Sequence, residues 1–314
     1  MKNIIYIIIS ILSVMSFSSC YKEAALTASA DNQGYVLPQG TSDYDTTILN
    51  FYNKYGKYLL YKFSDKDTYW TPGGWKNAAP SATVSGGYWN PGYLVTNANP
   101  AYVKKQLKLI DSTWFSFYSD SFLKNFLPTK IMLCATVDSV YPSVLSFGPP
   151  IAYSVNTKSV PAWYNYDNIC VNNGRPFIDS MTTANKKTYL ARVNLAFAQS
   201  IIARNMVSAT SAFASVANYN TTINSTALRF AQGIIYNSNT PTADLDWGAY
   251  ILAMVSTSEK NLNANVAATD ATYNGILNVT KDVNGRIKQR YTMVRNYYIS
   301  NYNVDLQAIG NAAN

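Results

Sequence analysis

The chain has 314 residues, of which 48% are hydrophobic and 13% charged, and its formal net charge is +8. This length and apolar content suit one large domain or two small ones with a proper core, and they exclude a disordered chain. No histidine occurs, which excludes Ser/His/Asp and Cys/His triads, the HExxH zinc site and every histidine-dependent general base. The positive charges are scattered rather than gathered in a basic block, so nucleic acid is not expected as a partner.

The N-terminal segment predicts an exported lipoprotein. Lys2 precedes an apolar run from Ile4 to Phe17, and two serines stand directly before Cys20. This arrangement is typical of a signal peptide that ends in a lipobox, and the run is shorter than the roughly 20 residues that a spanning helix needs. We therefore expect removal of residues 1–19 and acylation of Cys20. The alternative is an ordinary secretory signal with an incidental cysteine.

The stretch that follows, residues 20–40, is polar and rich in small residues, which predicts a flexible tether. Lys22 and Glu23 partly resemble the short charged signal that sends some lipoproteins to the outer face of the outer membrane. The expected location is the outer membrane, and the sequence leaves open whether the domain faces the periplasm or the cell surface.

Residues 41–314 are predicted to form a single α+β domain. Apolar residues at helical spacing predict helices within 41–56, 101–118, 184–206, 244–255 and 283–300. Strands are expected over 58–63 and, fully buried, over 130–137. Residues 141–180 are rich in proline and asparagine and are predicted as loops. Helices interleaved with few strands favour an α+β fold over a parallel βαβ series.

Aromatic residues concentrate between positions 65 and 100, in a segment too rich in glycine and proline for core helices. Exposed rings beside asparagines suit stacking against sugar rings or gripping an extended peptide. The alternative is that these rings fold back over the sheet as a small core of their own. The candidate ligand-binding residues are Trp70, Trp75, Tyr88, Trp89 and Tyr93.

Two cysteines lie inside the domain. Cys134 ends the apolar run that begins at Ile131, which favours a small buried core residue. An oxidising periplasm would permit a disulfide between Cys134 and Cys170. A zinc site with two cysteines and no histidine is not expected, and no metal or other cofactor is predicted.

Other chemical motifs are weak. Ser121 and Lys124 have the S-x-x-K spacing of penicillin-recognising enzymes, but the S-D-N and K-T-G motifs do not occur. Only two glutamates are present, which removes glutamate-pair glycosidase chemistry. Three pairs of aspartates are separated by one residue each. Positions at helix starts and in a turn explain these pairs more simply than catalysis does. These pairs are Asp43 with Asp45, Asp65 with Asp67, and Asp244 with Asp246.

Four segments, taken in order, resemble a known family. They are the opening helix and strand from Tyr44 to Trp70, the segment Phe126–Leu133, the segment Asp246–Tyr250, and the tail from Ile287 to Leu306. The family is that of the zinc-binding metallopeptidase lipoproteins associated with substrate import in Gram-negative bacteria that take up glycans through paired outer-membrane proteins. The resemblance implies a zincin-like, metallopeptidase-type domain with several helices and a small mixed sheet.

Active members of this family carry HExxH on the helix that corresponds here to residues 184–206. That spacing places both imidazoles on one helix face, so that they reach one metal while the glutamate activates the bound water. In this chain Ala198, Gln199 and Ile202 stand where the first histidine, the glutamate and the second histidine would be. The resemblance therefore implies a peptidase fold without a peptidase site.

The expected function is a non-catalytic accessory or binding component of a glycan or nutrient uptake system. The expected partners are a membrane through the lipid anchor, a glycan or peptide ligand, and outer-membrane import proteins. Two alternatives come from other classes. One is a hydrolase that uses an unrecognised aspartate or Ser/Lys site, and the other is a purely structural surface protein.

Overall fold

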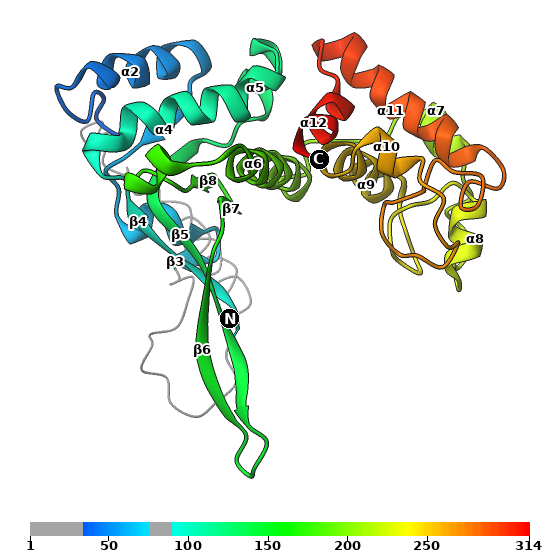
Figure 1. The fold of residues 1–314 in the computed structure, drawn as a ribbon. Helices are drawn as coiled ribbons and strands as arrows, with labels where there is room; N and C mark the ends of the chain where they lie inside the picture. Colours follow the sequence, from blue (N-terminus) through cyan, green and yellow to red (C-terminus); the bar gives the residue numbers. More distant parts are fainter. Residues whose placement is uncertain (1–33, 76–89) are drawn as a thin grey trace, which may run out of the picture. The chain divides into compact units, whose positions relative to one another are not determined.

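The computed structural model describes residues 34–75 and 90–314. A first unit ends at Val36, and the second unit, Leu37–Asn314, contains every helix and strand given below. The predicted signal peptide and Cys20 lie outside the described residues. The predicted α+β fold with several helices and a small mixed sheet is confirmed (Figure 1). No helix in the described ranges has both the length and the apolarity required to cross a bilayer.

The sheet has six strands and is built around one long strand, β5. The first residues of β5 pair in parallel with β1 and β8, and β8 pairs antiparallel with β7. Further along, β5 pairs antiparallel with β4 and β6. Two short strands, β2 (Trp70–Thr71) and β3 (Gly74–Trp75), form a separate ribbon. The strands of the sheet are β1 (Tyr58–Leu60), β4 (Gly92–Asn97), β5 (Lys130–Ser146), β6 (Ala152–Ser159), β7 (Ala162–Asn165) and β8 (Asn168–Val171).

The strand predicted over 130–137 is confirmed and continues to Ser146. The prediction for the segment 141–180 is wrong, because this segment, predicted as loops, contains β6, β7 and β8. Most prolines of this segment lie between the strands or in η2, and only Pro142 lies within a strand. Pro142 lies in β5 beyond Val140, the last residue that pairs with β4. Within the described residues, no strand pairs with β5 at Pro142 on the side where β4 pairs earlier. The N–H that Pro142 lacks therefore interrupts no strand pairing on that side.

The five predicted helices are confirmed, although the one predicted over 101–118 ends at Thr113 and is followed by a short 3₁₀ turn, η1 (Phe115–Phe117). A second 3₁₀ turn, η2, spans Pro176–Ser180. The helices are α2 (Asp43–Tyr55), α3 (Asp65–Tyr69), α4 (Pro100–Thr113), α5 (Asp120–Phe126), α6 (Thr183–Ala203), α7 (Ser211–Ser215), α8 (Thr226–Ala231), α9 (Ala243–Ser256), α10 (Glu259–Leu262), α11 (Arg286–Tyr302) and α12 (Leu306–Ala313).

Local sequence sets the helix ends. At the start of α2, Ser42 and Asp45 form a capping box, in which each side chain bonds the backbone of the other residue. The helix ends at Gly56, whose φ of 67° is the left-handed conformation that glycine adopts without a steric cost. Thr182 caps α6 by accepting a bond from the Asn185 N–H at 3.1 Å.

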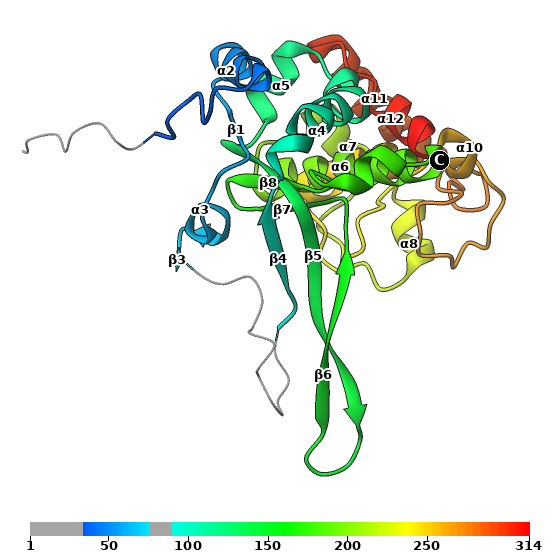
Figure 2. The ribbon, with the colours of Figure 1, turned by 60° about the vertical axis from the view of Figure 1, so that its left-hand side comes forward.

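Helix α6 occupies the centre of the fold. Its residues Tyr189, Val193, Phe197 and Ile201 recur every fourth position and are all buried, as expected for one face of a helix that enters a core. It contacts β7 and β8 of the sheet as well as α4, α9 and α12. Figure 2 shows α6 beside the ends of β7 and β8, with the hairpin of β5 and β6 extending away from the helices.

Candidate functional site

Of the positions where the resemblance would place a metal site, Ala198 is buried in the helical core, and Gln199 and Ile202 are half-buried. Ala198 of α6 is 3% exposed. It lines a small cavity of about 10 Å³ whose other lining residues are mostly hydrocarbon and include Phe122, Ile251 and Leu306. Ile202 packs against Gly248 of α9 so closely that a methyl group added to this glycine would lie 3.2 Å from the Ile202 Cδ1 atom. A space of this size holds one water at most, so it has no room for a substrate.

The residues at these positions do not fit a zinc ion. A zinc site needs nitrogen, sulfur or oxygen lone pairs from three or four ligands at about 2.0–2.3 Å. Ala198 and Ile202 offer only hydrocarbon, and Gln199 has a neutral amide where a carboxylate would be needed. Across residues 34–75 and 90–314, no group of three or more Cys, Asp or Glu side chains is arranged to hold a metal.

The aspartates that occur in near pairs do not converge on one site; each binds a different partner. Asp43 forms an ion pair with Lys104, and Asp45 accepts a hydrogen bond from the Tyr61 hydroxyl at 3.0 Å. The other partners are the Ser64 N–H for Asp67, at 2.8 Å, and the Ala209 N–H for Asp244, at 2.7 Å. Ser121 and Lys124 are both exposed on α5, where solvent surrounds the two side chains.

Asp246 has a larger structural role than the helix-dipole interaction predicted for it. Its carboxylate is fully buried and lies 2.5 Å from the Arg290 guanidinium of α11. It also accepts bonds from the N–H groups of Ile235 and Tyr236, at 2.9 and 2.8 Å. The guanidinium carbon lies 3.7 Å from the centre of the Phe213 ring. This buried network joins α9, α11 and the loop that follows α8.

Cys134 and Cys170 are both buried, as the apolar context of Cys134 predicts, and both are free thiols. They lie on the neighbouring strands β5 and β8, where Cys170 pairs in register with Met132 rather than with Cys134. Burial raises the pKa of the Cys134 thiol well above its usual value, so this side chain remains protonated at neutral pH.

The predicted aromatic segment begins on a short helix that is held firmly against the sheet. In α3 the carbonyl of Thr68 accepts hydrogen bonds from the side-chain amides of Asn165 and Asn168, at 2.8 and 2.9 Å. The Lys130 ammonium bonds the Asp67 carbonyl at 2.7 Å. These polar contacts, all made to the backbone of α3, fix the direction in which the next residues, Tyr69 and Trp70, leave the helix.

Four aromatic residues form what we call the aromatic face: Trp70, Tyr93, Trp163 and Tyr166. Trp163 of β7 stacks on Tyr93 of β4, with ring centres 4.6 Å apart and planes at 13°. Trp70 and Tyr166 meet edge to face at 6.0 Å. The buried Tyr69 lies 6.0 Å from Trp163 and directly precedes Trp70 in the chain, which places the two pairs near each other.

The aromatic face is open to solvent at its outer pair. Trp70 is 38% exposed and Tyr166 is 51% exposed, whereas Tyr93 and Trp163 are half-buried. Below them, burial raises the pKa of Tyr69 to about 12, so its hydroxyl stays neutral and accepts the Val95 N–H at 3.1 Å. The arrangement presents flat apolar rings on a rigid base, which suits a ligand with flat apolar faces.

The structure therefore brings together two of the five predicted ligand-binding residues, Trp70 and Tyr93. The backbone of Trp75 pairs with Trp70 in the β2–β3 ribbon, but its side chain, like Tyr88 and Trp89, lies outside the described residues. Sequence analysis missed Trp163 and Tyr166, because their segment was predicted as loop. Three of the four residues from Trp163 to Tyr166 are aromatic, and such enrichment is a strand signal that could have identified them.

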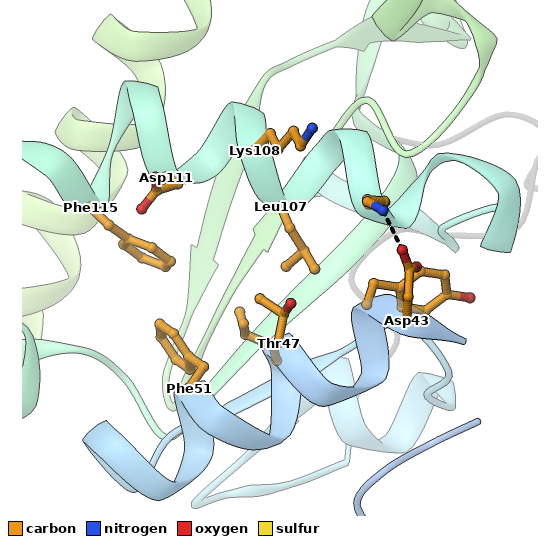
Figure 3. Close-up of a pocket in the computed structure, with 10 residues that line it drawn as sticks. Asp43, Thr47, Phe51, Leu107, Lys108, Asp111 and Phe115 are labelled. Carbon is orange, nitrogen blue, oxygen red and sulfur yellow. Dashed lines mark hydrogen bonds and ion pairs between the residues drawn. The ribbon is translucent and has the colours of Figure 1, made fainter. Parts of the chain in front are cut away.

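A second feature, not predicted from the sequence, is a pocket of about 450 Å³ between α2 and α4, which we call the α2–α4 pocket. Figure 3 shows Phe51 and Phe115 next to each other at one end of this pocket, away from Asp43, and their stacked rings have centres 5.2 Å apart. Leu107 adds to the apolar floor, while Lys108 and Asp111 stand exposed at the rim. The pocket can take an apolar group and offers charges of both signs beside it.

Comparisons with known proteins find little. No protein-family model matches the chain, and no curated protein matches it. Among solved structures, it is similar to a "putative zinc-binding metallo-peptidase" from Bacteroides caccae ATCC 43185, with 12% sequence identity, a TM-score of 0.42 and coverage of 87% of this chain and 93% of that one. That structure is of the class implied by the sequence resemblance, and we draw nothing about the site or its chemistry from so distant a match.

Proposed function

We propose that this protein is an outer-membrane lipoprotein without peptidase activity, which binds a glycan through the aromatic face as an accessory component of a nutrient-uptake system. The observation that carries the proposal is the pair of exposed rings, Trp70 and Tyr166, beside the Tyr93–Trp163 stack. Sugar rings present apolar C–H faces that stack on such side chains. Lipidation at Cys20 and a partnership with import proteins rest on the N-terminal sequence and on the family resemblance.

The proposed lack of peptidase activity rests on the side chains available to bind a metal. The chain has no histidine, and hydrocarbon fills the positions of both imidazoles. We expect the purified full-length lipoprotein to hold well below one zinc per chain in elemental analysis, before and after incubation with zinc. One tightly bound zinc per chain would contradict this part of the proposal and would favour a hydrolase.

Replacing Trp70 by alanine is expected to weaken glycan binding about fivefold, because the loss of one stacking ring costs about 1 kcal/mol. Retardation of the lipoprotein in native gels that contain neutral polysaccharides measures the effect. The matched control is Phe177→Ala, which removes a ring of similar exposure, 39% against 38%, in η2. Equal retardation of both variants and the unchanged protein, or no retardation by any polysaccharide, would rule out a glycan site at the aromatic face.

A peptide ligand is the second candidate, favoured by the apolar floor and mixed charges of the α2–α4 pocket. Thr47 lines this pocket and is exposed, so that Thr47→Arg fills the space without disturbing the core. Should the ligand be a peptide with apolar side chains, Thr47→Arg is expected to reduce its binding at least about tenfold by steric exclusion. Fluorescence anisotropy with a labelled peptide library measures the effect, and Trp70→Ala serves as the control that leaves the pocket intact.

A further inference from the structure

The tip of the β5–β6 hairpin exposes apolar side chains to an unusual degree. Phe147 is 86% exposed, the highest value among the large hydrophobic residues of the described ranges, and Leu145 is 72% exposed. Ile151 and Val144 follow at 46% and 43%. Single exposed apolar residues are ordinary on protein surfaces, but several at the end of one projection mark an interaction site.

The hairpin carries this tip away from the rest of the fold. β4 pairs with β5 only as far as Val140, whereas β6 pairs with β5 as far as Ser146. Six residues at about 3.4 Å each place the tip roughly 20 Å beyond the end of the β4 pairing. Figures 1 and 2 both show the hairpin projecting from the sheet on the side away from the helices.

The chemistry of the hairpin suits an environment of low polarity. No charged residue occurs from Ser139 to Thr157. The two arms pair with each other without a register shift from Asp138 to Val144, and one shift follows between Val144 and Ser146. The polar side chains on the arms also pair internally, because the Ser143 and Ser154 hydroxyls lie 2.9 Å apart and the Asn156 amide donates to Ser143 at 2.5 Å. Within the described residues, the outer edges of both arms keep unpaired backbone groups beyond Val140, so the hairpin suits the hydrated interfacial layer of a bilayer and not its hydrocarbon core.

Two tyrosines mark the depth to which such a hairpin could enter. Tyr153 pairs in register with Val144, directly below the tip, and Tyr141 pairs with Asn156 further down. Tyr141 is 37% exposed. Tyrosine rings are enriched at the level of lipid headgroups, where the ring meets hydrocarbon and the hydroxyl meets water. Below them, the first charged residues of the two arms are Asp138 and Lys158, which pair with Ser159 and Ser139.

We infer that the tip of the hairpin, residues 144–151, inserts into the interfacial layer of a lipid bilayer. A bilayer is favoured over a protein partner because the tip lacks the charged side chains and free hydrogen-bonding side chains that orient a protein interface. The inference rests on the proposed lipid anchor for the identity of the membrane that the tip meets. With both contacts, the domain is held to the membrane at two points, and the tip restricts its orientation.

A fluorescent probe at the tip tests this inference in the full-length lipoprotein. In Phe147→Cys, an environment-sensitive fluorophore is attached under native conditions, where Cys134 and Cys170 are fully buried and do not react. The control is Val279→Cys, because Val279 is 79% exposed. Each labelled protein is reconstituted with vesicles of phosphatidylethanolamine and phosphatidylglycerol, with and without brominated lipid, and is then floated on a density gradient.

We expect the probe at position 147 to shift its emission to shorter wavelength and to be quenched by brominated lipid, while the probe at position 279 does neither. A chain that floats with vesicles but keeps an aqueous probe at position 147 overturns the inference, leaves the anchor in place and points to a protein partner for the tip. A chain that remains at the bottom of the gradient overturns both the inserted tip and the anchor.

Discussion

Replacing Arg290 by methionine is expected to lower the free energy of unfolding by about 3–5 kcal/mol, because the change leaves the Asp246 carboxylate buried without its counter-charge. Both side chains of this ion pair have no solvent exposure. The guanidinium also donates to the Gly233 carbonyl, at 2.5 Å, and to the Tyr219 hydroxyl. Methionine restores the packing volume but none of these bonds. Urea denaturation followed by tryptophan fluorescence measures the loss.

Two further variants show whether the buried charge is the cause. Arg295→Met removes the equivalent side chain from a pair with Asp305 that is 27% and 33% exposed, and we expect a loss of about 1 kcal/mol or less because solvent screens such a pair. Asp246→Asn keeps an oxygen that can accept the Ile235 and Tyr236 N–H groups but removes the charge. In that background, Arg290→Met is expected to cost much less. An equal cost in both backgrounds would contradict the explanation.

The helices of this fold were predictable because their signals are local. The period of Tyr189, Val193, Phe197 and Ile201 identifies α6 without knowledge of what covers it, and Gly56 ends α2 by its own backbone preference. Strands β6 to β8 were harder to predict, since the parallel pairing of β8 with β5 joins segments that are far apart in the sequence, although the β5–β6 and β7–β8 pairs are local hairpins. Asparagine in those strands and proline in the connections around them then favoured a prediction of loops.

The candidate site shows the same division. The sequence alone shows that the chain has no histidine, and α6 therefore cannot carry an HExxH zinc site. The exposed pair of Trp70 and Tyr166, by contrast, comes from segments almost a hundred residues apart, which only the tertiary fold brings together. The first-turn position of Asp246 is a local feature that predicts a helix start, whereas its burial against Arg290 depends on a residue 44 positions away.

Replacing Gly310 by alanine is expected to destabilise the protein by about 3 kcal/mol, at the upper end of what overpacking costs. A methyl group on this residue of α12 would lie 2.1 Å from the Met254 carbonyl oxygen and 2.6 Å from that of Thr257. Both are backbone atoms at the end of α9, so they cannot rotate aside, and the two helices must separate. Separation would also strain the bond from the Gln307 amide to the Thr257 carbonyl, which is 2.9 Å long.

Gly73→Ala is the matched control for this prediction, because a methyl group at Gly73 would meet nothing within 4 Å. Its effect on the urea midpoint is expected to be small, or slightly stabilising through the unfolded state. Leu306, in the first turn of α12, lines the same small cavity as Ala198, so displacement of α12 would also open this apolar space. An unchanged midpoint for Gly310→Ala would mean that α12 shifts without cost and that the close packing around Ala198 does not depend on it.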